Sequence, residues 1–131
     1  MIKELAAKVF AGLVHRKNQK WIQNPINAQN QVFQELLKKG RNTVFGKDHA
    51  FETITEINQF KAKVPVRDYE AFRPYIEDVL NGGRDVLWPG RPLYYAKSSG
   101  TTSGAKFIPI TADSMPQHIR AARAAGLNYI K

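Results

Sequence analysis

The residues best suited to chemistry lie in one short run, Ser98-Ser99-Gly100-Thr101-Thr102-Ser103-Gly104-Ala105-Lys106. Apolar, strand-like segments flank this run at residues 93–95 and 107–110. Glycines let backbone N–H groups converge on an anion, while hydroxyl groups and a lysine add hydrogen bonds and positive charge. The run is therefore typical of a loop that binds a polyphosphate.

The spacing differs from that of the usual phosphate loop. Three residues separate Gly100 from Gly104, and Ala105 stands between Gly104 and Lys106. The Walker pattern instead has four residues between its two glycines and a lysine directly after the second glycine. The alternative is a flexible hairpin turn, because Gly, Ser and Thr are common in turns. Residue types alone leave both interpretations open. Ordinary hairpin loops need only two to five residues, so seven small residues and a lysine favour the anion site.

Composition limits the class of protein. The chain has 131 residues, of which 43% are hydrophobic and 24% charged, and this is typical of one folded domain rather than disorder. It has no cysteine, so disulfides and thiolate chemistry are excluded and a reducing compartment is suitable. Apolar runs are too short for a secretory signal or a membrane span. We therefore expect a cytoplasmic protein without stable membrane insertion.

The net charge of +9 raises a second possibility, a small basic helical module that binds nucleic acid or an anionic membrane. The basic residues are scattered along predicted helices, however, which favours solvated helix faces and no nucleic-acid partner. A third possibility is a structural scaffold with a mobile hairpin. His15, His49 and His118 are far apart in the sequence, so we expect no metal site among them.

The residues before the small-residue run read as helices. Apolar residues at helical spacing predict amphipathic helices over residues 2–20 and 28–39. The Asn24-Pro25 pair predicts a turn between them, and Gly40 a C-terminal cap. Gly46 and Asp48 indicate a loop. The expected buried residues of these two helices are Ile2, Leu5, Val9, Phe10, Leu13, Val14, Val32, Phe33, Leu36 and Leu37.

Further helix starts are predicted from capping residues. Thr53 and Glu56 form a possible capping box for a short helix through Phe60. Asp68 is suited to cap the next helix, which we expect Pro74 to interrupt.

The rest of the chain is expected to mix strands with one helix. Residues 86–88 read as a short strand and Pro89-Gly90 as a turn, while Thr111 is expected to cap a final helix with Met115 and Ile119 on its apolar face. That helix is still in phase at residue 131, and two or three short strands make no self-sufficient sheet. We therefore expect the sequence to be the N-terminal part of a longer protein.

The run at 98–106 resembles the phosphate-loop signature of adenylate-forming enzymes. Its surroundings sharpen the likeness, because residues 64–70, 73–76, 87–90 and 107–111 resemble the N-terminal part of the auxin-responsive Gretchen Hagen family of acyl-acid amido synthetases. Residues 30–48 fit the same family, so the likeness covers about residues 25–131. Ser103, Ala105 and Phe107 depart from the broader adenylating signature and fit the amido-synthetase branch better.

This resemblance implies an α/β fold: a mainly helical segment (1–82), then strand, phosphate loop, strand and helix (86–131), forming the N-terminal portion of an adenylate-forming domain of the ANL type. The implied reaction uses Mg2+ and ATP to convert a carboxylic acid into an acyl-adenylate, and an amine, typically of an amino acid, then takes the acyl group. Lys106 would neutralise phosphate charge as the catalytic residue. Other ATP contacts would come from Ser98, Ser99, Gly100, Thr101, Thr102, Ser103 and Gly104. Family members are several times longer, so the isolated chain is expected to lack turnover.

Overall fold

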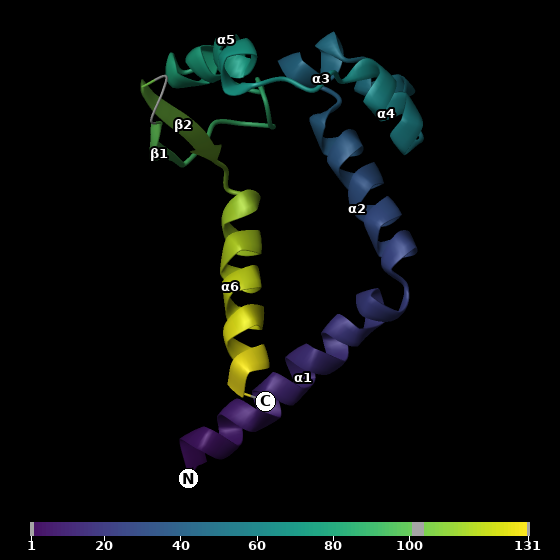
Figure 1. Ribbon diagram of the computed structural model, residues 1–131, viewed down its shortest axis with the longest axis vertical. Helices are drawn as coiled ribbons and strands as arrows, with labels where there is room; N and C mark the ends of the chain where they lie inside the picture. Colours follow the sequence, from purple (N-terminus) through teal and green to yellow (C-terminus); the bar gives the residue numbers. More distant parts are fainter. Residues whose placement is uncertain (1, 101–103, 131) are drawn as a thin grey trace. The chain divides into compact units, whose positions relative to one another are not determined.

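The computed structural model describes residues 2–100 and 104–130 and is mainly helical, with one small antiparallel sheet (Figure 1). It divides into two compact units, which are described separately below. The first unit lies within Met1–Val32 and Asp113–Lys131, and the second is Phe33–Ala112. The elements are α1 (Ile2–Gln23), α2 (Pro25–Gly40), α3 (Val44–Asp48), the 3-10 turn η1 (Phe51–Thr53), α4 (Ile57–Lys63), α5 (Tyr69–Leu80), β1 (Tyr94–Gly100), β2 (Gly104–Ile110) and α6 (Ser114–Ile130).

The first unit has very little core. It consists of α1, the beginning of α2 and α6, and α1 packs against α6. Among the side chains described there, Ala11 is buried, whereas Val9, Phe10 and Leu13 are exposed. The prediction that these large residues form the buried face of the first helix is therefore wrong. No helix in the described part of the chain has the length and apolar character needed to cross a membrane.

The start of α6 also differs from the prediction. The helix begins at Ser114, so Thr111, the predicted cap, lies three residues before its first residue. Ile119, expected on the apolar face, is exposed, while Met115 is half-buried. A weakly amphipathic helix of this kind lacks a single apolar face strong enough to fix its rotation.

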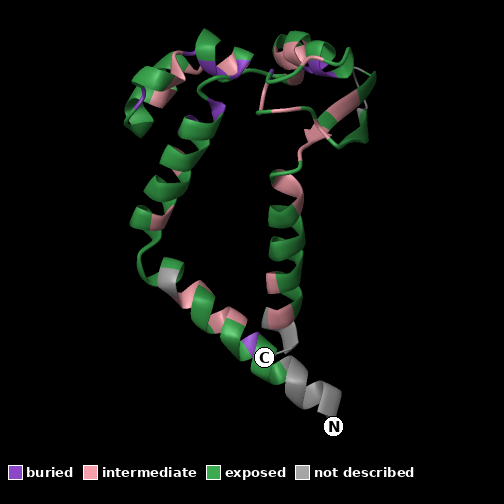
Figure 2. Ribbon diagram, turned by 180° about the vertical axis from the view of Figure 1, so that it is seen from behind, coloured by how far each residue is buried: buried purple, intermediate pink, exposed green. Residues whose placement is uncertain are grey.

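The second unit holds an aromatic core, and most residues drawn as buried in Figure 2 belong to it. The Phe45 ring lies at its centre, with ring centroids 5.5 Å from Phe72 and 5.2 Å from Tyr75 in edge-on geometry. Phe51 and the buried His49 complete its surroundings, at 5.8 and 4.1 Å. Such edge-to-face pairs add to the gain from burial. Leu37, Ile54, Ile76, Val79 and Val86 supply the buried aliphatic part.

The end of α2 and the start of α3 meet at very close range. Gly40 is the last residue of α2, so the helix ends where the sequence predicts, and this glycine has no positive φ. A Cβ on Gly46 would lie 2.0 Å from the carbonyl oxygen of Gly40, so only glycine fits there. Residues 44–48 form a helix rather than the predicted loop, because Thr43 caps it by accepting from the Gly46 N–H at 2.9 Å.

Two of the predicted caps have different outcomes. Asp68 accepts a hydrogen bond from the Ala71 N–H at 2.9 Å, so the predicted cap of α5 is confirmed. The capping box at Thr53 and Glu56 is wrong, because Glu56 makes no side-chain cap bond. Instead, Gln59 reaches back and accepts from the Thr55 N–H at 2.8 Å.

Pro74 does not interrupt α5, contrary to the prediction. A proline removes one helical hydrogen bond and crowds the carbonyl four residues earlier. Here Phe72 and Tyr75, on either side of it, both pack on Phe45 and hold the helix together. The helix then ends in a Schellman motif, in which Gly82 has φ +90° and the Gly83 N–H donates to the Asp78 carbonyl at 2.9 Å.

Residues 86–88 are not a strand. They lie in a loop in which the Asp85 N–H donates to the Gly90 carbonyl at 3.0 Å, and Gly90 has φ +84°, as expected for the Pro89-Gly90 turn. The Asp85 and Val86 carbonyls accept the first two N–H groups of α3, at 2.8 and 3.0 Å. The carbonyl groups of this loop therefore accept hydrogen bonds from the start of a helix instead of pairing with a neighbouring strand.

Candidate functional site

The predicted strands pair as an antiparallel hairpin. Its register places Ser98 opposite Lys106, Ser99 opposite Ala105 and Gly100 opposite Gly104. The ladder thus extends into the small-residue run, so the expectation of one long loop there is wrong. Thr101, Thr102 and Ser103 lie outside the described residues, and only these three positions separate the two strands.

The register divides the predicted site residues between the two faces of the hairpin. Side chains directly opposite each other share a face, so Ser98 and Lys106 lie on one face and Ser99 on the other. Ser98 and Ser99 are exposed, and Lys106 is half-buried. Ser98 and Lys106 are therefore a hydroxyl-bearing and an ammonium-bearing residue on the same face of the hairpin.

Tyr69, the first residue of α5, holds β2 at this point. Its hydroxyl accepts a hydrogen bond from the Phe107 N–H at 2.8 Å. The Nζ of Lys106 lies 5.5 Å from the centroid of the Tyr69 ring, within the range of a cation–π interaction. Lys106 makes no ion pair with the other described residues. Its charge is consequently available to an anion from solution.

A second cation near the same ring is already paired. The guanidinium carbon of Arg73 lies 6.0 Å from the Tyr69 centroid, and its Nε and Nη2 donate to the Glu70 carboxylate at 2.8 and 2.9 Å. The hydrogen bond and charge of Glu70 raise the pKa of Arg73 above its ordinary value. The charge of Arg73 is thus compensated by the Glu70 carboxylate, whereas the charge of Lys106 is not compensated by any described residue.

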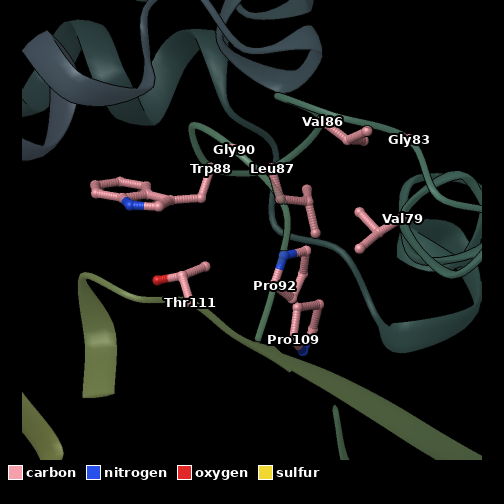
Figure 3. A pocket seen from close by; sticks show the side chains of 9 residues that line it. All are labelled: Val79, Gly83, Val86, Leu87, Trp88, Gly90, Pro92, Pro109 and Thr111. Carbon is pink, nitrogen blue, oxygen red and sulfur yellow. The ribbon is translucent and has the colours of Figure 1, made fainter. Parts of the chain in front are cut away.

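The base of the hairpin packs on α5 and on the loop before β1. The Tyr95 hydroxyl donates to the Val79 carbonyl at 3.0 Å. A small apolar pocket lies at the same end (Figure 3), lined mainly by Val79, Leu87, Trp88, Pro92, Pro109 and Thr111. The mostly apolar residues that line this pocket offer few polar groups to a ligand.

The histidines form no shared site. His49 is buried, its Nδ1–H donates to the Phe45 carbonyl at 2.8 Å and its ring lies against Phe45, so it has a packing role. His118 is exposed on α6. Among the described residues, no group of three or more His, Asp or Glu side chains could hold a metal ion.

Comparison with known proteins establishes the family. The model of the GH3 family N-terminal domain matches residues 14–131. This chain belongs to the GH3 family. The match agrees with the resemblance seen at the hairpin and in its flanking segments.

Named relatives in the family are amido synthetases. The chain is 34% identical over 89 residues to the probable indole-3-acetic acid-amido synthetase GH3.2 of Oryza sativa subsp. japonica, covering 66% of this chain and 14% of that protein. It is 31% identical over 91 residues to indole-3-acetic acid-amido synthetase GH3.2 of Arabidopsis thaliana, covering 69% and 17%. With GH3.5 of the same plant it is 27% identical over 119 residues, or 85% and 19%. The matched part is therefore less than a fifth of each of these relatives.

Sequence patterns predicted no role for Tyr69 beyond its place in a segment that resembles the family. Its contact with Phe107 spans 38 positions, so no local pattern reports it. The available signal was a tyrosine directly after a strong helix cap, Asp68. A bulky polar-tipped side chain at the first position of a helix can reach a neighbouring element with both its ring and its hydroxyl.

Proposed function

We propose that this chain forms the part of an ATP-dependent acyl-acid amido synthetase that holds the phosphates of ATP. One observation carries the proposal: Lys106 lies opposite Ser98 on the hairpin, and its ammonium has no carboxylate partner among the described residues. The Tyr69 ring lies 5.5 Å from the same ammonium and does not cancel its charge. Family membership supports the ligase chemistry.

In the proposed reaction, a carboxylate oxygen attacks the α-phosphorus of ATP, and the bond to the bridging oxygen of pyrophosphate breaks. The products are an acyl-adenylate and pyrophosphate, and an amino-acid amine then displaces AMP. Negative charge increases on the departing pyrophosphate, so fixed donors at its oxygens lower the barrier. Removing one such donor typically costs about 3–4 kcal/mol, or roughly two to three powers of ten in rate.

The proposed roles follow the hairpin. Lys106 neutralises the β- and γ-phosphates, Gly100 and Gly104 allow close backbone approach, and Ser98 and Ser99 shape the entry to the turn. Thr101, Thr102 and Ser103, which join the strands, donate hydrogen bonds to phosphate oxygens. Gly104 has φ +82°, a conformation that glycine adopts without strain.

The proposal includes an adenylate-forming fold for the whole protein, a cytoplasmic location, and a carboxylic acid and an amino acid as substrates. Mg2+ would accompany ATP and offset phosphate charge. The described residues contain no cluster of His, Asp and Glu side chains for that ion. We therefore assign no residue of this chain to it.

The direct test is nucleotide binding to the chain, followed by 31P NMR during titration with Mg-ATP. Lys106→Ala should weaken binding by about ten- to a hundredfold, since one charge-assisted contact is worth roughly 1.5–3 kcal/mol. Lys97→Ala is the matched control, because Lys97 lies opposite Phe107 on the other face of the same hairpin. Equal losses in both variants would point to unspecific attraction by the basic chain.

A second measurement tests the chemistry. This chain would replace the corresponding segment of the Arabidopsis GH3.2 enzyme, and carboxylate-dependent exchange of pyrophosphate into ATP would be measured. Exchange should fall by about a hundredfold with Lys106→Ala, the effect of losing one transition-state donor. Unchanged exchange would contradict the role of Lys106. Strongly salt-dependent DNA binding instead of nucleotide binding would support the basic-module alternative.

A further inference from the structure

Tyr69 contacts two consecutive residues of β2. Its hydroxyl accepts the Phe107 N–H at 2.8 Å, and its ring lies 5.5 Å from the Nζ of Lys106. These two residues come from a strand 38 positions away from Tyr69 along the chain. One half-buried side chain thus fixes both the backbone of β2 and the direction of its lysine.

The hydroxyl acts at the free edge of the hairpin. In an antiparallel pair, a residue directs its N–H and C=O either both toward the partner strand or both away from it. Because the Phe107 N–H donates to Tyr69, the outer edge of β2 carries the backbone groups of Phe107. Pro109, two residues later, belongs to the same edge, where a missing N–H costs no ladder bond. The Tyr69 hydroxyl is therefore the hydrogen-bond acceptor that fixes the hairpin on α5 next to Lys106.

The ring holds Lys106 without cancelling its charge. A carboxylate at this place would also fix the ammonium, but it would compete with any bound phosphate. The neighbouring Arg73 shows that arrangement, since Glu70 binds its guanidinium at 2.8 and 2.9 Å. An aromatic face attracts a cation through its quadrupole and leaves the net charge in place. It also removes rotamer freedom that a lysine would otherwise lose on binding.

We propose that Tyr69 is the positioning residue of Lys106, holding the ammonium ready for the oxygens of a polyphosphate. The proposal rests on the function proposed above and goes further, because it names the group that prepares the lysine. Tyr69 itself acts through Lys106 and Phe107 rather than on the nucleotide.

Two substitutions separate the two contacts. Tyr69→Phe keeps the ring and removes the hydroxyl, while Tyr69→Leu removes both. Tyr75→Phe is the matched control, since it removes another tyrosine hydroxyl from α5, one that donates to Asp48 at 2.8 Å. Circular dichroism checks that each variant keeps its helices. Readouts are the ring-current shift of the Lys106 side-chain protons, exchange of the Phe107 amide, and affinity for inorganic tripolyphosphate.

Tyr69→Phe should keep the Lys106 ring-current shift, speed exchange of the Phe107 amide by about tenfold and weaken tripolyphosphate binding only two- to threefold, because one neutral hydrogen bond is lost. Tyr69→Leu should abolish the shift and weaken binding by about five- to tenfold, since the preorganised cation is lost. Tyr75→Phe should leave all three unchanged. In a Lys106→Ala background, Tyr69→Leu should cause a further loss of at most two- to threefold, the part that comes from its hydroxyl.

Certain results would overturn the proposal. A Lys106 shift that persists in Tyr69→Leu would show that the ring does not hold the lysine. An equal loss of affinity from Tyr69→Leu with and without Lys106 would show a general structural effect. If the unmodified chain binds tripolyphosphate and Tyr69→Leu binds it equally well, the role of Tyr69 fails alone. If the unmodified chain binds none, the proposed function fails and this proposal with it.

Discussion

The two units of the chain differ in how far their apolar residues are covered. In the second unit Leu37 is 5% exposed, whereas in the first unit Leu13 is 59% exposed, although both residues belong to helices. In the second unit the Phe45 ring lies against those of Phe51 and Phe72, and the Phe51 ring lies against that of Phe60. Stability in this chain should therefore come from the second unit, which also carries the candidate site.

The difference in packing also explains why a side chain can be held in a defined position in the second unit. An ammonium group can be held at a defined place only if its support is itself fixed. Lys106 is supported by Tyr69 on α5, and α5 packs through Phe72 and Tyr75 onto Phe45. Burial and the hydrogen bond to Asp48 raise the pKa of Tyr75, so this tyrosine stays neutral there. The aromatic core thus connects folding of the second unit to the geometry of the hairpin.

The largest expected effect comes from Gly46→Ala. A Cβ at this position would lie 2.0 Å from the Gly40 carbonyl oxygen, which is backbone and cannot move aside alone. The helix junction must open, so we expect a loss of about 4 kcal/mol or more, in the range of exceptional substitutions. Thermal unfolding followed by near-UV circular dichroism of the aromatic core would measure it. Gly12→Ala is the control, since nothing lies within 4 Å of a Cβ there.

The next largest effect is expected from truncating a buried leucine of the second unit. Leu37→Ala should destabilise the second unit by about 2–5 kcal/mol, because it leaves a cavity in a packed core. Leu36→Ala, one position away on the same helix, is the control because Leu36 is half exposed. Urea unfolding of both variants gives the difference. Equal costs would mean that α2 buries a different face in solution.

Local chemistry predicted some of these features well. Asp68 and the Pro89-Gly90 turn depend on interactions within a few residues, and both are found. The hairpin strands were also predicted, because apolar segments flank a turn-rich run. The close approach of Gly46 to Gly40 escaped prediction, since it depends on how two helices meet.

Other predictions were wrong because apolar residues were expected to be buried in a helix face or to form a strand. Residues 86–88 look like a strand, yet the Val86 carbonyl, together with that of Asp85, caps α3, which lies more than forty positions earlier in the chain. Val9 and Leu13 have helical spacing, yet they remain exposed. Periodicity reports that a helix has an apolar side and does not report what covers it. For the candidate site, the sequence indicated the small-residue run with its lysine but not the tyrosine that contacts this lysine.

A smaller effect should follow from Asp68→Ala. The Asp68 carboxylate accepts the Ala71 N–H at 2.9 Å at the exposed start of α5, directly before Tyr69. Losing such a cap costs about 1 kcal/mol. Because the first turn of α5 carries Tyr69, we also expect faster exchange of the Phe107 amide. Asp68→Asn is the control, since asparagine caps about as well. A Phe107 amide that exchanges equally in Asp68→Ala would separate the cap from the hairpin.

The smallest effect is expected in the first unit. Leu13→Ala removes a large side chain from α1, but that side chain is 59% exposed, and alanine favours helix slightly more than leucine. We therefore expect a change within about 0.5 kcal/mol, the usual range for surface positions. Urea unfolding would place it beside Leu37→Ala, the same substitution in the second unit. A loss above about 2 kcal/mol would show that α1 buries Leu13 in solution, and the contrast between the two units would then disappear.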